Sequence, residues 1–381
     1  MQIRHTSAII LIALSLVTGV LHAEPFIPTD DNQVLEQLPN AIADAPLLSL
    51  QADLKRTPAD LNIALRLAQE QIEQARNIGD PRYLGRAEAT LAPWWESQEP
   101  PIEVLVMRAI LHQANHEFDL SIEDLTRAIK RDPSNVQAWL TRASVFQVRG
   151  DYARATSDCR QLAHLQQAFV AQVCLAEVAS LDGHAEQAYQ LLEKLAAQVA
   201  TEPNSLRWIE GLLADVAERL GNITAAEQHY HAALAIGTPD MFLLTSYADY
   251  LLEQKRPEEV IRLLESHIGS DGALLRLALA ASDIHHPNAT LYKEDLQARF
   301  AASRLRGSNL HLREEARFRL ELLHQPEAAL PLAVANWAIQ REPADTIILL
   351  DAASAAHRPD AAQPVLNWLQ ETNQQDKRMT R

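Results

Sequence analysis

A small residue recurs at nearly constant intervals through the middle of this chain. Successive copies lie 34, 33, 38, 34 and 30 residues apart. They are Ala109, Ala143, Ala176, Ala214, Ala248 and Ala278. A drifting amphipathic helix would not keep this register, whereas stacked repeat units keep it by construction. The repeat therefore constrains the fold more than any other feature of the sequence.

Each repeat contains the pattern of two helices joined by a turn. The clearest copy is residues 136–162, where apolar and small residues recur at helical spacing on both sides of Gly150 and Asp151. The apolar positions are Trp139, Ala143 and Phe146, then Tyr152, Ala155, Cys159 and Leu162. Glycines at 183 and 221 mark the next turns, and Pro257 stands where the following glycine would be expected. The pattern predicts antiparallel helical hairpins.

An aromatic residue, a small residue four positions later, a glycine turn and then Tyr-x-x-Ala together resemble the tetratricopeptide (TPR) repeat, a unit of about 34 residues. The resemblance extends from about Pro58 to Leu369 and is strongest in the middle third. It implies an all-α fold, a right-handed α-solenoid of eight or nine hairpins. With only 11 glycines in 381 residues, the composition also favours helices.

The pattern divides the chain into six segments. They are a signal peptide (1–23), a lead-in and capping segment (24–57), a degenerate first hairpin (58–101), five well-formed repeats (102–270), divergent C-terminal repeats (271–370) and a flexible tail (371–381). Terminal repeats of a solenoid are usually atypical because one side faces water, so the degenerate ends fit this division.

The N-terminus has the features of an export signal. Arg4 precedes an apolar run from Ala8 to Leu21, and Ala23 is a small residue at the expected cleavage site. No cysteine follows the run, so the lipobox of a bacterial lipoprotein is missing. We expect a periplasmic or secreted protein with no stable membrane insertion after cleavage. The alternative is a retained N-terminal anchor.

The charge and the motifs favour a binding protein over an enzyme. The formal net charge of −16 disfavours nucleic acid as a partner. There is no Gly-rich phosphate loop, nucleophile elbow or H-E-x-x-H motif, so we expect no catalytic residue, cofactor or metal. The loop at His285 and His286 is the place where a non-local site remains an alternative.

The two cysteines, Cys159 and Cys174, fall on adjoining helices of neighbouring repeats. An exported protein permits a disulfide between them. The alternative is two buried, reduced thiols that pack as small apolar residues, because register alone does not fix the distance between the two Cβ atoms. The sequence leaves both open.

The TPR resemblance also implies where a partner would bind. In such proteins the first-helix side chains beyond the small residue line a concave groove. Here these positions are Ser144, Gln147, Glu177, Asp215, Glu218, Asp249 and Glu253, with Trp208 and Phe242 nearby. An acidic groove with aromatic residues favours a basic or amphipathic protein or peptide segment. The alternative is that an acidic protein places carboxylates on any solvated face.

A run of arginines departs from the acidic background. It comprises Arg299, Arg304, Arg306, Arg313, Arg317 and Arg319. These side chains form either a site for an anion or acidic partner, or an ion-paired surface. The function that the whole sequence favours is a non-catalytic scaffold for protein binding. The alternatives are an accessory or maturation subunit of an envelope enzyme complex, and an enzyme with a non-local site.

Overall fold

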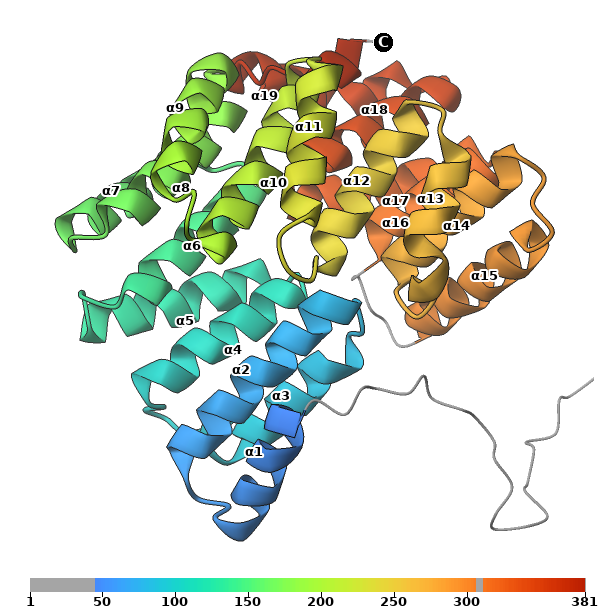
Figure 1. The fold of residues 1–381 in the computed structure, drawn as a ribbon. Coiled ribbons are helices and arrows are strands. Elements are labelled where there is room, and N and C mark those ends of the chain that lie inside the picture. Colours follow the sequence, from blue (N-terminus) through green and yellow to red (C-terminus); the bar gives the residue numbers. More distant parts are fainter. Residues whose placement is uncertain (1–44, 306–310, 381) are drawn as a thin grey trace, which may run out of the picture. The chain divides into compact units, whose positions relative to one another are not determined.

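The computed structural model describes residues 45–305 and 311–380, which form helices and no strand (Figure 1). Residues 46–381 form one compact unit. The expected signal peptide, most of the lead-in segment and Arg306 lie outside the described residues. None of the described helices is long and apolar enough to cross a membrane.

A capping helix and nine helical hairpins follow one another along the described chain (Figure 1). Helix α1 (Ala45–Arg56) is followed by α2 (Leu61–Ile78) and α3 (Arg82–Trp95), α4 (Ile102–Ala114) and α5 (Phe118–Arg131), α6 (Val136–Val148) and α7 (Tyr152–His164), and α8 (Ala168–Leu181) and α9 (Ala185–Gln198). Next come α10 (Pro203–Arg219) and α11 (Ile223–Leu234), α12 (Met241–Glu253) and α13 (Pro257–Leu264) with the 3₁₀ turn η1 (Glu265–His267), and α14 (Asp271–Asp283) and α15 (Ala289–Leu305). In the eighth hairpin, α16 (Leu312–Arg317) continues into the π-helical turn η2 (Phe318–Leu322) and pairs with α17 (Pro326–Ile339). The ninth pairs α18 (Pro343–Ala355) with α19 (Pro359–Thr372), and the 3₁₀ turn η3 (Lys377–Thr380) follows.

The turn inside every hairpin contains one residue in the left-handed conformation, with φ between 53° and 78°. These residues are Gly79, His116, Gly150, Gly183, Gly221, Lys255, His285, His324 and His357. A left-handed residue directly after a helix reverses the chain, and glycine adopts it without steric cost. The sixth turn differs from the expectation, because its special residue is Lys255, and Pro257 is already the first residue of α13.

The recurring small residues are the contact points between helices. All six alanines of the repeat are buried. In the hairpin of α4 and α5, the hydroxyl of Ser121 also donates to the carbonyl of Ala109 at 2.8 Å. Side chains this small let neighbouring helices approach closely, so the period in the sequence is the period of close packing. At the N-terminal end, Leu47 and Leu50 of α1 cover Leu67 of α2.

A buried ion pair also repeats, and the sequence pattern alone did not reveal it. Arg108 of α4 pairs with Asp124 of α5, and 34 residues later Arg142 of α6 pairs with Asp158 of α7, with Nε and Oδ2 2.7 Å apart. Both aspartates are buried, so each pair fixes the first helix of its hairpin to the second.

The two ends of the described chain pack against its middle. One hydrophobic cluster joins Phe146 and Leu181 of the middle hairpins to Trp337 and Ile348 of the last two (Figure 1). At the N-terminal end, α2 contacts α12. The described part of the solenoid is therefore closed on itself, and the C-terminal helices cover part of the surface that an open array would expose.

The segment after α19 also differs from the expected flexible tail. Asn373 takes the left-handed conformation with φ 49°, Asp376 is buried, and η3 contacts both α10 and α18. The composition of residues 371–380 is polar and predicts fraying, whereas the structure places η3 against α10 and α18.

Candidate partner-binding face

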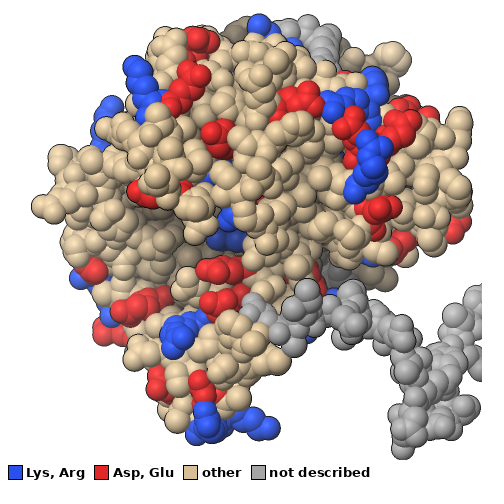
Figure 2. Space-filling model, viewed as in Figure 1, with Lys and Arg blue, Asp and Glu red and all other residues tan. Residues whose placement is uncertain are grey.

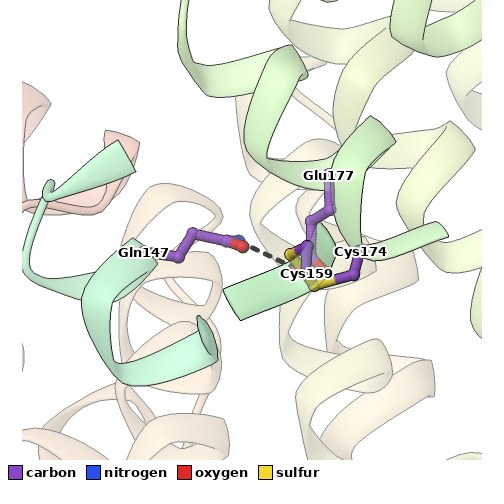
Figure 3. Close-up of a disulfide and its surroundings, with 4 residues drawn as sticks. All are labelled: Gln147, Cys159, Cys174 and Glu177. Atoms are coloured by element: carbon purple, nitrogen blue, oxygen red, sulfur yellow. Dashed lines mark hydrogen bonds between the residues drawn. A yellow bond between two sulfur atoms is a disulfide. The ribbon is translucent and has the colours of Figure 1, made fainter. Parts of the chain in front are cut away.

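The first helices α6, α8, α10 and α12 bring the expected groove residues onto neighbouring positions. Gln147 of α6 donates to Glu177 of α8 at 2.9 Å (Figure 3). Burial raises the pKa of Glu177, and the nearby carboxylate of Asp215 raises it further. Ser144 accepts a hydrogen bond from Gln113 at 3.3 Å. Ser144, Gln147 and Glu177 are therefore engaged in hydrogen bonds within the chain.

Asp249 already has two basic partners within the chain, and its side chain is 33% exposed. Two arginines hold it: Nε of Arg276 donates to Oδ1 at 3.0 Å, and Arg317 of α16 donates to the same oxygen. Burial alone would raise the pKa of Asp249, but these two guanidinium groups lower it to about 2. The chain's own C-terminal half thus provides the basic group that the groove was expected to receive from another protein.

Glu218 is also engaged from within the chain. It is 6% exposed and accepts a hydrogen bond from the hydroxyl of Tyr230 at 3.1 Å. Nη1 of Arg378, in η3, lies 3.6 Å from Oε2 of Glu218. Burial raises the pKa of Glu218 to about 8, although Arg378 opposes this shift.

This shift predicts a pH-dependent stability. Because the pKa of Glu218 is raised in the folded chain, its stabilising effect is complete in acid and is lost as the pH rises through about 8. Between pH 7 and 9 we expect the free energy of unfolding to fall by roughly 1 kcal/mol from this group. Urea unfolding of the wild type and of Glu218→Gln measures it. In Glu218→Gln the free energy of unfolding should fall less between pH 7 and 9 than in the wild type. An equal fall in both proteins would contradict the raised pKa of Glu218.

Three groove residues remain accessible on the first helices α10 and α12. Phe242 is 77% exposed and Trp208 is 37% exposed. They are 34 residues apart, as are Ala214 and Ala248, so they occupy the same position in consecutive repeats. The side chain of Asp215 is 47% exposed and pairs only with Arg219, one turn along its own helix. Trp208 and Asp215 lie seven residues apart on α10, so the same helix offers an exposed aromatic ring and an accessible carboxylate, which can together hold an amphipathic segment.

The two cysteines form a disulfide that links α7 to α8 (Figure 3). Their Cα atoms are 5.6 Å apart, and both side chains are buried. The bridge joins the second helix of one hairpin to the first helix of the next. Cys174 and Glu177 lie one turn apart on α8, so the bridge fixes the helix that carries Glu177.

Three features decide the architecture of the described chain. They are the nine equivalent turns, the buried small residue of the repeats, and the alternation of first and second helices. The chain is a TPR-type α-solenoid. No protein-family model and no curated protein matches it.

Several solved structures are similar to this solenoid. A TPR protein from Parabacteroides merdae is 17% identical, with 66% of this chain and 90% of that chain covered and a TM-score of 0.43. The Rap protein complexed with competence and sporulation factor is 13% identical, with coverage of 86% and 92% and a TM-score of 0.47. A human IFIT1 dimer with m7Gppp-AAAA is 12% identical, with coverage of 86% and 85% and a TM-score of 0.45. We draw no functional conclusion from these likenesses.

The arginine run of the solenoid is ion-paired at each of its described members. Arg299 pairs with Asp271 and Asp295, Arg304 and Arg319 with Glu315, Arg313 with Glu342 and Asp345, and Arg317 with Asp249 and Glu321. In the view of Figure 2, basic and acidic side chains are likewise interspersed. Of the two interpretations that the sequence left open, the paired surface describes these residues.

The histidine loop has a structural role in the turn of its hairpin. His285 is the left-handed turn residue, and Nδ1 of His286 accepts from the backbone of Asn288 at 3.2 Å. Within residues 45–305 and 311–380, no three histidine, cysteine or acidic side chains are grouped to hold a metal ion.

Two important groups were missed from the sequence. One is the carboxylate of Asp345, fully buried between α16, α17 and α18. It accepts from Asn336 at 2.7 Å and from Gln340 at 3.0 Å. The other is Arg378, whose partner Glu218 is 160 residues away in the sequence. The contact of Arg378 has no local signal, because its partner lies in a distant hairpin, whereas the two amide donors to Asp345 lie within 9 residues of it.

Proposed function

We propose that this protein is a non-catalytic scaffold that binds a partner protein or peptide on the first-helix face of α10 and α12. The observation that carries the proposal is the exposed pair of Trp208 and Phe242 at equivalent positions of consecutive repeats. Exposing two large aromatic side chains on one face is unfavourable for a chain that stays alone, and aromatic residues dominate the energy of protein interfaces.

The proposed partner presents a basic or amphipathic segment. Asp215 is accessible on the same helix as Trp208, and the whole chain carries a net charge of −16. A basic group on the partner would gain from this field, and an apolar group would cover the aromatic rings. The same charge opposes the phosphate backbone of a nucleic acid, so we propose a protein partner.

We further propose that the protein acts outside the cytoplasm. The N-terminal pattern of Arg4, an apolar run and Ala23 supports cleavage and release into the periplasm or the medium. The disulfide between Cys159 and Cys174 supports an oxidising compartment, since such bridges are rare in the cytosol.

The test is an affinity capture from envelope extract with three matched baits. They are the wild type, the double variant Trp208→Ser with Phe242→Ser, and Leu291→Ser. Leu291 is 61% exposed on α15, a second helix, so its loss removes an exposed apolar group away from the proposed face. We expect the wild type and Leu291→Ser to retain the same partner and the double variant to lose it at least tenfold, because each exposed anchor contributes on the order of 1 kcal/mol or more.

A partner retained equally by all three baits, or no partner with any bait, contradicts this proposal. Capture of an enzyme by the wild type and Leu291→Ser, with loss by the double variant, identifies the scaffold as an accessory subunit of that enzyme. Circular dichroism of each bait checks that the helices are unchanged.

A further inference from the structure

The C-terminal segment crosses three consecutive hairpin turns at very short range. A Cβ atom placed on Gly150 would lie 2.8 Å from Cζ2 of Trp368. On Gly183 it would lie 2.9 Å from Cβ of Asn373, and on Gly221 it would lie 2.6 Å from Cδ of Lys377. Helix α19 therefore covers the turn of α6–α7 through Trp368, and the residues after it run over the turns of α8–α9 and α10–α11.

The remaining turns show that the left-handed backbone alone does not demand glycine here. Five of the nine hairpins have histidine or lysine in that conformation, with φ between 53° and 59°. The four that have glycine are the three crossed turns and Gly79, where a Cβ would lie 2.5 Å from Oγ of Ser270. Glycine thus occurs where another part of the chain lies against the turn; at Gly183 the close atoms are Cβ and the backbone oxygen of Asn373, and at Gly221 they are the flexible end of Lys377. The turns at Gly183 and Gly221 form a row against which an extended segment lies.

Two polar contacts between the segment and this row are long. Nε2 of Gln374 donates to the hydroxyl of Tyr152 at 3.4 Å, and Arg378 reaches Glu218 at 3.6 Å. Arg378 also pairs with Asp376 at 2.7 Å inside the segment itself. The buried Oε1 of Gln374 has no hydrogen-bond partner in the described structure. The segment thus fits the turns closely, but its polar contacts with them are long. This combination favours a segment that another peptide can displace over one that is a permanent part of the core.

We propose that the row formed by Gly183, Gly221 and Glu218 is a docking surface for an extended polar segment that carries a basic pair. In the free protein, residues 373–380 occupy this surface as a latch. A partner segment of the same chemistry binds by displacing them. This inference extends the proposed scaffold function, since it adds a second surface, along the turns, that opens only when the latch leaves.

The latch is opened in the full chain by one substitution. Asn373 directly follows α19 and has a φ of 49°, which proline cannot adopt. Asn373→Pro therefore changes the direction of the backbone from residue 373 onward. Asn373→Gly keeps the left-handed path and is the matched control. The probe is a fluorescent peptide with the sequence of residues 372–380, measured by anisotropy. We expect Asn373→Pro to bind it at least tenfold more tightly than the wild type and Asn373→Gly, in which the latch competes.

A second pair of substitutions locates the peptide on the row. In the Asn373→Pro chain, Gly183→Ala puts a methyl group where Asn373 of the peptide must lie, and we expect it to abolish binding. Gly237→Ala is the control, because Gly237 has a similar φ of 62° but a Cβ there would meet no atom closer than 3.6 Å. It should bind the peptide as well as Asn373→Pro alone.

Hydrogen exchange checks the opening itself. We expect the amides of residues 374–380 to exchange at least tenfold faster in Asn373→Pro than in Asn373→Gly. Unchanged exchange, peptide binding no tighter than to the wild type, or equal binding by the Gly183→Ala and Gly237→Ala chains would each overturn the proposal. No partner protein is used, so this outcome is independent of the capture experiment with Trp208 and Phe242.

Discussion

Trp368→Ala is expected to lower the free energy of unfolding by about 3–5 kcal/mol, the usual cost of deleting a buried tryptophan. The ring lies between hairpins that are far apart in sequence: its centroid is 6.0 Å from that of Tyr152 and 6.0 Å from that of Trp337. The guanidinium of Arg341 stacks over it at 6.0 Å. Removing the ring leaves a cavity at the contact that closes the solenoid.

Urea unfolding measures this effect, and Trp208→Ala is the matched control. Trp208 undergoes the same chemical deletion but is 37% exposed, so its loss should change stability far less. The amides of α19 should also exchange faster in Trp368→Ala, because that helix is held to α6 and α7 through this ring. Equal destabilisation by the two substitutions would mean that closure does not depend on Trp368.

Asp345→Ala should also cost about 3–5 kcal/mol, because it leaves buried donors without their acceptor. The carboxylate accepts from Asn336, Gln340 and the backbone of Glu342. Arg313 of α16 adds a fourth donor at 3.3 Å. All these groups are inside the last two hairpins, so the substitution should loosen α16, α17 and α18 together.

The control for Asp345 is Asp360→Ala. Asp360 also pairs with an arginine in the last hairpin, Arg358, but both side chains are solvent-exposed. A surface pair of this kind contributes little, so the midpoint of urea unfolding should barely move. A small effect for Asp345→Ala as well would show that water replaces the lost carboxylate.

The hairpins themselves are predictable because their contacts are local. The first and second helices of one unit touch across a single turn, and neighbouring units touch one period later. The burial of Ala143 and the left-handed turn at Gly150 therefore leave a periodic signal in the sequence. The same register predicted the positions of the groove residues and placed Cys159 and Cys174 on adjoining helices, without deciding whether the two are joined.

The contacts that the groove residues make could not be predicted from the sequence, as Asp249 shows. Its acidic side chain and its repeat position suggested a site open to a basic partner. The structure satisfies it with Arg317, 68 residues further along the chain. Likewise, Gly183 reads from sequence as an ordinary turn glycine, whereas the structure shows Asn373 packed on it.

The sequence by itself thus determined the repeat, its helices and the face that each side chain occupies, because interactions within and between adjacent units depend only on a spacing of about 34 residues. Only the tertiary structure decided which part of that face stays open. Closure depends on the small rotation between successive hairpins, summed over nine of them in the described chain. Each rotation is set by many packing contacts, so no single residue or motif encodes where the two ends meet the middle.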